Sequence, residues 1–383
     1  MKSVPILDVA DAVASGPAEF AGTKQYFATA DVNGSDLLDG TEVTFDGRPS
    51  RANLVAQQND VLFAKMQATD KVVHVNGRAE SAIFSTGFFN LRAKRDVLDS
   101  RFLFWFLRSP QFQFEKDKRC TGATQKALTL SGLREILLPS IPDIGEQKRL
   151  AAILDKADNV KRKRSLSLQS LHELIASEFV SRFGNAATNP KKLPTAPIKE
   201  FGKVVTGNTP PRKNPSNFGK NIEWIKSDNI NTPSHFLTPA EEWLSEVGRK
   251  IGRTAPAGST LVTCIAGSPS VIGNAALADR EVAFNQQINA VIPGHETDPF
   301  FLYCQFLVSK SLVQAASTNS MKGMVSKGKF QEIKFLKPSP EEQRDFGNFF
   351  SRTTSLGGRL EESQRDCNAF FDSLITSAFR GEL

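Results

Sequence analysis

Two long stretches of the chain repeat apolar residues at spacings of three and four, a pattern that predicts helices with one buried stripe. They cover residues 142–183 and 338–379, and they align without a gap when the sequence is shifted by 196 positions. Proline and acidic residues precede both starts, as at Pro142-Asp143, where a carboxylate meets the positive end of a helix. A helix of about 38 residues would be roughly 57 Å long. Helices of that length need a partner, so we expect an antiparallel coiled coil.

The apolar stripe of these helices supplies the expected helix-pair or partner interface. Its members are Leu150, Ile153, Leu154, Leu171, Leu174 and Ile175 in the first helix, and Phe346, Phe349, Phe350, Leu360, Phe370, Phe371 and Leu374 in the second. Gly357 and Gly358 would each cost about 1 kcal/mol inside the second helix, which predicts a kink or a gap that faces a partner. The basic run 161–164 is predicted to be a solvated surface, with contact to DNA phosphate as the alternative.

The segments between the helices also share one plan. In the first, β-prone stretches at 42–45, 60–65, 72–75 and 82–91 precede a helical stretch at 100–118. In the second, stretches at 222–226, 260–265 and 282–292 precede a helical stretch at 299–316. We therefore predict an α+β fold with a pseudo-twofold internal repeat: globular mixed α/β domains at 1–141 and 185–337, and long helices at 142–184 and 338–383.

Charge is unevenly distributed along these segments. The chain has a net charge of +7, and residues 184–337 hold 18 basic and 11 acidic side chains. A basic domain is compatible with nucleic-acid binding. No secretory signal or 18-residue apolar run is present, so we expect a cytoplasmic protein without membrane contact. The four cysteines and four histidines lie far apart, so no metal site is expected.

Motifs for catalysis are missing from the sequence. An adenine methyltransferase would need a DPPY or NPPY loop and a glycine-rich cofactor turn, and neither occurs. Residues 323–330 imitate GxxxxGK, but Phe330 stands where a magnesium-binding hydroxyl would be needed, so a polar loop is predicted instead. We expect no catalytic residues and no enzyme activity in this chain.

Several motifs carry a family resemblance. They are the PxxxxEQ helix starts (142–147 and 338–343), Val204–Arg212, Trp224–Ile230, Phe284–Gln287, Ser377–Leu383, Asp60–Lys65 and Gly122–Gln125. With these residues the chain resembles, over essentially its whole length, the specificity subunits of type I restriction–modification systems. The first half lacks the TGxTP opening of Thr206–Pro210, so the resemblance is stronger for residues 198–383.

The resemblance implies two target recognition domains, each reading one half of a bipartite, asymmetric site in double-stranded DNA. The helices would then set the spacer and dock two methyltransferase (modification) subunits, and a motor-nuclease (restriction) subunit could join them. It implies that S-adenosylmethionine, Mg and ATP are bound by those partners, with no cofactor in this chain. The alternatives are a coiled-coil scaffold, an orphan DNA-binding protein and a restriction enzyme that acts alone.

Polar loop residues are the candidates for DNA contact, because lysine and arginine neutralise phosphate while amides and arginine can pair with base edges. The candidates are Lys65, Gln67, Thr124, Gln125 and Lys126 in the first domain, and Arg212, Lys213, Lys226, Ser227, Lys322, Lys327 and Lys329 in the second. Residues 285–287 are amides that could read bases, although consecutive amides more often satisfy backbone groups.

Overall fold

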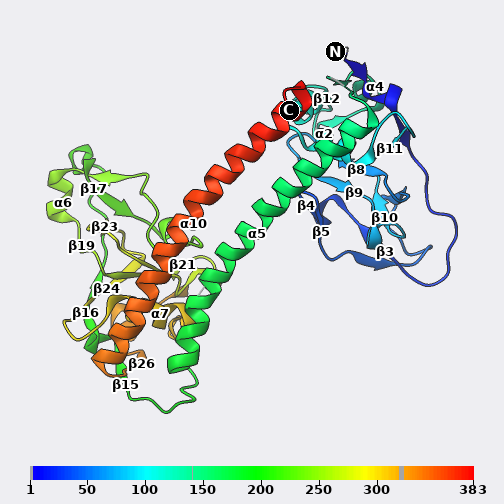
Figure 1. The fold of residues 1–383 in the computed structure, drawn as a ribbon. Helices are drawn as coiled ribbons and strands as arrows, with labels where there is room; N and C mark the ends of the chain where they lie inside the picture. Colours follow the sequence, from blue (N-terminus) through cyan, green and yellow to red (C-terminus); the bar gives the residue numbers. More distant parts are fainter. Residues whose placement is uncertain (1–2, 140, 319–322) are drawn as a thin grey trace. The chain divides into compact units, whose positions relative to one another are not determined.

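The computed structural model describes residues 3–139, 141–318 and 323–383, which form two compact units. The first unit contains Met1–Ser165 and Glu362–Leu383, and the second contains Leu166–Glu361. The long helices α5 (Ile144–Phe183) and α10 (Pro340–Arg380) are therefore divided between the units (Figure 1). Each unit combines one globular part with half of each long helix, which differs from a division into four separate segments.

The first unit is built on two four-stranded sheets. One has the order β6-β3-β10-β7 (Thr41–Val43, Lys24–Phe27, Ile83–Ser85, Ala52–Val55), and the other β2-β11-β8-β9 (Ala10–Val13, Phe88–Ala93, Val61–Ala64, Val72–His74). Two-stranded pairs are β1-β14 (Val4–Pro5, Leu137–Leu138), β4-β5 (Val32–Asn33, Asp36–Leu37) and β12-β13 (Cys120–Thr121, Ala127–Leu128). Its helices are α1 (Ile6–Val9), α2 (Ser100–Arg108), α3 (Pro110–Lys118) and α4 (Leu130–Arg134), with 3-10 turns η1 (Thr29–Asp31) and η2 (Gly77–Ala79).

The second unit repeats this plan. Its sheets have the orders β18-β17-β23-β19 (Trp243–Leu244, Phe218–Ile225, Val282–Phe284, Thr254–Ala255) and β16-β24-β20-β22 (Gly202–Thr206, Ile288–Pro293, Thr260–Thr263, Ala275–Leu277). The two-stranded pairs are β15-β26 (Thr195–Pro197, Lys334–Leu336) and β21-β25 (Ile265–Ala266, Gly323–Met324). Its helices are α6 (Glu246–Ile251), α7 (Pro299–Val308), α8 (Lys310–Ala315) and α9 (Lys327–Gln331), with turns η3 (Ile198–Glu200), η4 (Pro215–Asn217), η5 (Ser227–Asn229) and η6 (Pro269–Val271).

Strand pairing shows that the two plans are equivalent in detail. One pair in each unit is parallel, β3 with β10 and β17 with β23, and every other strand pair in the described residues is antiparallel. Phe27 pairs with Phe84 in the first unit, as Ile225 does with Phe284 in the second. The repeat therefore extends through the globular parts, where little sequence identity is visible.

Both predicted long helices are present, and their starts lie 196 residues apart, as the sequence alignment requires. Asp143 caps α5 by accepting the amide of Glu146 over 3.0 Å. Ser339 and Glu342 form a reciprocal capping box on α10, with bonds of 3.3 and 2.9 Å. Gly357-Gly358 lies inside an unbroken helix, so these residues do not end or interrupt it.

The helices pack on each other and on the globular part within each unit. In the first unit, Leu150 and Leu154 of α5 share a hydrophobic core with Phe371 of α10. In the second, Phe179 of α5 lies 5.2 Å from Phe346 of α10, ring centre to ring centre. Ile175 and Phe350 belong to the same core, whereas Ile153, Leu171, Phe349, Leu360 and Leu374 are half-buried.

For the helix pair, two residues of the predicted helix-pair or partner interface are wrong. Leu174 is 44% exposed and Phe370 is 64% exposed, so neither belongs to the packed seam. The buried positions are their neighbours, Ile175 and Phe371. In an α-helix a shift of one residue turns a side chain by about 100°, because one turn takes 3.6 residues.

The basic run 161–164 was predicted to be a solvated surface, but three of its side chains contact other residues of the first unit. Arg164 donates to the Ser363 hydroxyl of α10 over 2.7 Å, and Lys161 lies 5.1 Å over the Phe371 ring. Arg162 bonds to Asp158 and to the turn between β4 and β5. The run therefore fastens α5 to its surroundings inside the first unit.

Strand boundaries differ from the sequence expectation in one systematic way. The apolar runs 82–91 and 282–292 each divide into two strands that belong to different sheets, β10 and β11 or β23 and β24. A short turn separates them, at 86–87 in the first unit and 285–287 in the second. The helical stretches divide similarly at Ser109 and Ser309, and Ser109 accepts the amide of Phe112 as the cap of α3.

Candidate nucleic-acid interface

The structure brings the five candidates of the first unit together on two adjacent loops. The backbone amide of Gln67 donates to the backbone carbonyl of Lys126 over 3.0 Å, and Met66 forms a β-bridge with Ala127. Thr124 and Gln125 lie in the exposed loop between β12 and β13. A strand end and a hairpin tip therefore form one exposed polar edge.

Lys65 occupies a partly buried place at the base of this edge. Its ammonium lies 4.3 Å from the centre of the Phe89 ring, and burial lowers the pKa of this lysine. Its backbone carbonyl accepts the amide of Leu128 over 2.8 Å. Lys65 thus joins the two loops, while Lys126 is fully on the surface.

The second unit has the same loop pair. Val325 donates its amide to the carbonyl of Cys264 over 2.8 Å, as Leu128 does to Lys65, and β21 pairs with β25. The candidate Lys322 falls in this region but lies outside the described residues. Lys327 and Lys329 are exposed on α9, which contacts β16 and η3. Cys264 takes the place that Lys65 has in the first unit, so the base of this edge carries no charge.

Arg212 and Lys226 converge on a carboxylate that sequence reasoning did not single out. Arg212 bonds to Glu242 over 3.0 Å, and Lys226 bonds to the other oxygen of the same group. The hydrogen bond from Lys226, together with the charge of Arg212, holds the pKa of Glu242 below its usual value. The Arg212 guanidinium also lies 5.2 Å over the ring of Trp224. Glu242 partly cancels this pair of charges, whereas Lys213 is exposed nearby in sequence.

The turn 285–287 between β23 and β24 contains three side-chain amides and bonds to β21 and to Ser227 of the second unit's candidate surface. The carbonyl of Gln287 accepts the amides of Cys264 and Ile265 over 2.8 and 3.1 Å, and its side chain accepts from the Ser227 hydroxyl over 3.4 Å. Asn285 accepts the amide of Gln287 over 3.0 Å and is buried. Gln286 is exposed and bonds to Thr209. Asn285 and Gln287 therefore bond to groups within the domain, whereas the side chain of Gln286 lies on the surface.

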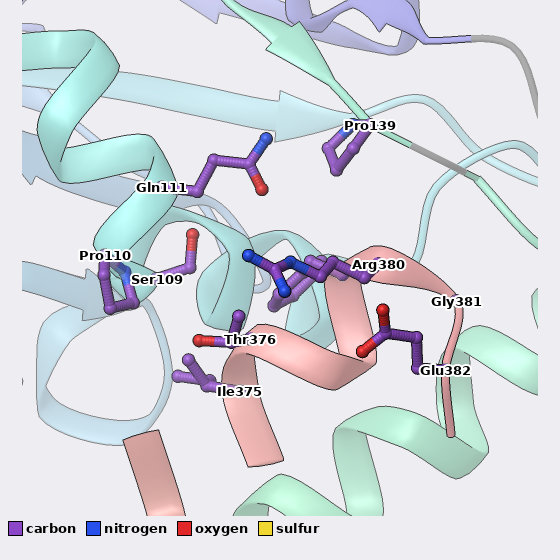
Figure 2. A pocket seen from close by; sticks show the side chains of 10 residues that line it. Ser109, Pro110, Gln111, Pro139, Ile375, Thr376, Arg380, Gly381 and Glu382 are labelled. Atoms are coloured by element: carbon purple, nitrogen blue, oxygen red, sulfur yellow. The ribbon is translucent and has the colours of Figure 1, made fainter. Parts of the chain in front are cut away.

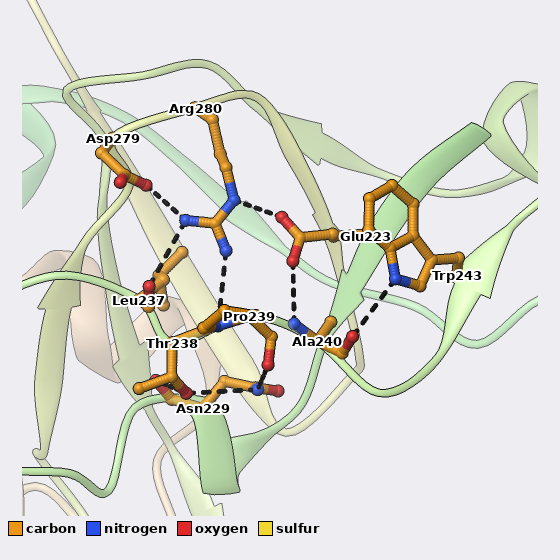
Figure 3. A network of polar contacts seen from close by, with 9 residues as sticks. All are labelled: Glu223, Asn229, Leu237, Thr238, Pro239, Ala240, Trp243, Asp279 and Arg280. Carbon is orange, nitrogen blue, oxygen red and sulfur yellow. Dashed lines mark hydrogen bonds and ion pairs between the residues drawn. The ribbon is translucent and has the colours of Figure 1, made fainter. Parts of the chain in front are cut away.

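An ion pair between the buried Glu223 and the half-buried Arg280 holds the loop that follows η5 (Figure 3). Glu223 bonds to Arg280 and accepts the amide of Ala240 over 2.8 Å, while Arg280 also donates to the carbonyls of Leu237 and Thr238. Burial alone would raise the pKa of Glu223, but these hydrogen bonds and the charge of Arg280 outweigh it and lower that pKa. The network fixes the segment 237–242, which supplies Glu242 to the candidate surface.

A cavity of about 760 Å³ lies beside the end of α10 in the first unit. Figure 2 shows the Arg380 side chain reaching across it toward Ser109, with Gln111 and Pro139 on the opposite wall. At the corresponding place in the second unit, Ala186 donates its amide to the Ser309 hydroxyl over 3.1 Å. In the second unit, the segment that follows α5 therefore contacts Ser309 at the place where the first unit has a cavity.

Across 3–139, 141–318 and 323–383, no group of three or more histidine, cysteine, aspartate or glutamate side chains could hold a metal ion. None of the helices described there is long and apolar enough to span a membrane.

Comparison with known families decides the classification. Residues 7–169 and 190–365 match the family model of the type I restriction modification DNA specificity domain, so the model matches once in each half. The chain belongs to this family. It is a type I restriction–modification specificity protein with two DNA recognition domains, which agrees with the resemblance drawn from its motifs.

One curated relative and two solved structures match this specificity protein along most of their length. The type I restriction enzyme HindI specificity subunit of Haemophilus influenzae is 28% identical, over 86% of this chain and 88% of that protein. A chain from a structural study of complex assembly and conformational transition of the type I R-M system aligns with a TM-score of 0.63 at 18% identity, covering 100% of this chain and 98% of that one. The type I restriction-modification system S subunit from M. genitalium aligns with a TM-score of 0.56 at 15% identity, covering 99% and 96%. At these identities the structural matches establish the fold.

Proposed function

We propose that each recognition domain of this specificity protein reads one half of a bipartite, asymmetric site in double-stranded DNA. The observation that carries the proposal is the repeated loop pair: the segment after β8 bonds to the segment before α4, and the segment after β20 bonds to the segment before α9. Equivalent edges with different side chains suit two half-sites of different sequence, because base readout depends on the side chains presented.

The residues assigned to DNA contact differ in kind between the edges. In the first domain, Thr124, Gln125 and Lys126 offer a hydroxyl, an amide and a charge on one loop. In the second, Gln286 and Ser227 offer polar groups, while Lys327 and Lys329 offer charge. Arg212 and Lys226 are better suited to orienting Glu242, which could accept from a cytosine amino group, than to neutralising phosphate.

We further propose that α5 and α10 form a continuous antiparallel coiled coil that sets the spacer between half-sites and docks two methyltransferase subunits. Contacts between the helices in each unit support this arrangement. Large apolar side chains remain exposed along the helices, namely Val160, Leu166, Leu174, Leu356 and Phe370. Exposed apolar residues in a long helix suit a partner surface.

On this proposal the chain has no catalytic role of its own. S-adenosylmethionine would be bound by the methyltransferase subunits, and Mg and ATP by a motor-nuclease subunit, in the cytoplasm. The chain would contribute recognition and geometry, so its absence would abolish methylation at its sites without changing the chemistry of the methyltransferase.

The test is genome-wide adenine methylation in cells that carry the chain and its candidate methyltransferase, compared with cells that lack the chain. The proposal expects a split asymmetric motif that disappears on deletion. If no motif depends on the chain, binding of the purified protein to random DNA would separate an orphan DNA-binding protein from a scaffold. Turnover of DNA by the chain alone with magnesium would instead indicate a self-sufficient restriction enzyme.

A further inference from the structure

The last turn of α3 holds the loop 66–69, which follows β8 in the first unit. Lys116 of this turn is fully buried, and its ammonium donates to the carbonyl of Met66 over 3.2 Å and to the carbonyl of Thr69. The carboxylate of Asp117 lies 3.4 Å from the same ammonium. The three donors of the ammonium therefore have three acceptors, and two of these are the ends of the loop.

Asp117 holds the middle of the same loop. Its carboxylate accepts the backbone amide of Ala68 over 3.1 Å, and its backbone carbonyl accepts the side-chain amide of Gln67 over 3.4 Å. Ala68 has a φ of 57°, in the left-handed region that is unfavourable for residues other than glycine. Gln67 and Ala68 are both exposed. The bonds from α3 therefore keep an exposed loop in a conformation that its own sequence does not favour.

Stability alone does not account for a buried lysine at this place. An ammonium loses its hydration on burial, and burial lowers the pKa of Lys116, although the charge of Asp117 opposes this. The attraction within a buried ion pair often does no more than offset that cost, so an apolar side chain of similar size would often serve the core as well. What the lysine adds is one defined position for both ends of the loop.

The second unit also ties the corresponding segment, between β21 and β22, to its helix with a lysine. Lys310 of α8 donates to the carbonyl of Ser270 over 2.5 Å and to the side chain of Asn274. Lys310 begins α8, whereas Lys116 lies in the last turn of α3. The two domains thus hold this segment with lysines that stand at different positions of the equivalent helices.

We propose that Lys116 and Asp117 are positioning residues for base reading: they hold the loop so that the side-chain amide of Gln67 meets a base edge in the first domain's half-site. The inference rests on the proposed function, since it names the residues that prepare one of its two reading edges. The amide has a donor and an acceptor, a combination that a base edge in the major groove can match. A loop that is already ordered loses less conformational entropy on binding, so base discrimination depends on the bonds from α3.

The variant Asp117→Ala tests the holding of the loop, because it removes the acceptor of the Ala68 amide. Glu115→Ala is the matched control: its carboxylate lies on the same helix, bonds to Arg119, and is 30% exposed against 34% for Asp117. Amide hydrogen exchange of the full chain without DNA should be about tenfold faster or more at Ala68 in Asp117→Ala, and unchanged in Glu115→Ala. Unchanged exchange in Asp117→Ala would overturn the inference.

Methylome sequencing of cells with the complete complex tests the reading role. Gln67→Ala, Asp117→Ala and Lys116→Met should each relax base preference about fivefold or more at the same position in one half of the motif. Asp117→Asn keeps an acceptor oxygen and should restore most of that preference, which a loss of stability alone would not explain. Glu115→Ala should leave both halves unchanged.

Two results would refute the inference while leaving the proposed function standing. In the first, the motif still depends on the chain, but Asp117→Ala reads it with unchanged preference. In the second, Gln67→Ala and Asp117→Ala relax different positions. A motif that does not depend on the chain at all would instead contradict the proposed function, and the exchange measurement, which needs no DNA, would still decide whether α3 holds the loop.

Discussion

The side-chain carbonyl of Gln147 accepts a hydrogen bond from the backbone amide of Asp99 over 2.8 Å, which joins the first turn of α5 to the start of α2. Gln343 and Asp298 repeat this bond over 3.3 Å at α10 and α7. Asp99 and Asp298 are themselves the caps of their helices. The glutamine of each PxxxxEQ motif is therefore the structural link between a long helix and its recognition domain.

Replacement of Gln147 by leucine should lower the free energy of unfolding by about 2 kcal/mol, because Asp99 and the carbonyl of Val97 lose buried partners. Urea denaturation followed by circular dichroism measures the change. Gln169→Leu serves as the control, since Gln169 is exposed on the same helix. Equal destabilisation by both variants would show that the buried bonds contribute nothing specific.

Adjacent phenylalanines on α10 should respond very differently to truncation. Phe371 is 4% exposed, and its ring lies 5.6 Å from that of Trp105, whereas Phe370 is 64% exposed. Phe371→Ala should cost about 3–5 kcal/mol of unfolding free energy, and Phe370→Ala about 0.5 kcal/mol or less. Thermal unfolding of the two variants side by side checks the assignment. A larger loss at Phe370 would mean that the helix faces are misassigned.

The Glu223–Arg280 pair should make stability depend on pH. Because the pKa of Glu223 is lowered in the folded chain, its contribution is present above the unfolded value near 4.5 and is lost as the pH falls through the folded value. The unfolding free energy of Glu223→Gln should therefore be about 2 kcal/mol below that of the unmodified chain at pH 7. The gap should narrow below about pH 4.5. A gap that is constant from pH 7 to pH 3 would contradict this account of the ion pair.

Salt dependence should identify the charged residues that meet phosphate. Lys126→Ala should reduce the slope of log binding constant against log salt by about 0.9, the value for one released phosphate contact. Lys148→Ala removes an exposed lysine near the start of α5 and should leave the slope unchanged. Fluorescence anisotropy across a salt series measures both. An unaltered slope for Lys126→Ala would place that lysine off the DNA.

The sequence predicted the long helices and their repeat well, because a 3.6-residue apolar period over about 40 residues leaves little ambiguity. It also placed Leu174 and Phe370 in the helix pair, although both are exposed, because each directly precedes a second large apolar residue and the pattern alone does not choose between the two. The globular parts were harder. Strands such as β7 and β19 are short, and their burial depends on partners distant in the sequence.

The candidate surface was predicted in part. The loops around Lys65 and Lys126 were singled out as separate segments, and the structure brings them into contact. Glu242 was missed because an acidic residue is not an obvious DNA ligand, and its role emerges only when Arg212 and Lys226 are seen to share it. A cavity of about 200 Å³ beside Gly358 is lined by Thr353, Thr354 and Glu361 of α10 and by Ser234 and His235 of a loop that the sequence does not place near this helix.

The central claim is that each recognition domain reads its own half of the DNA site. It is tested most directly by methylome sequencing of cells that carry either Thr124→Ala/Gln125→Ala in the first domain or Ser227→Ala/Gln286→Ala in the second. The account predicts that each variant relaxes base preference in one half of the motif, that the two variants affect opposite halves, and that the spacer length is unchanged. Relaxation of the same half by both variants, or an equal loss across the whole motif, would contradict it.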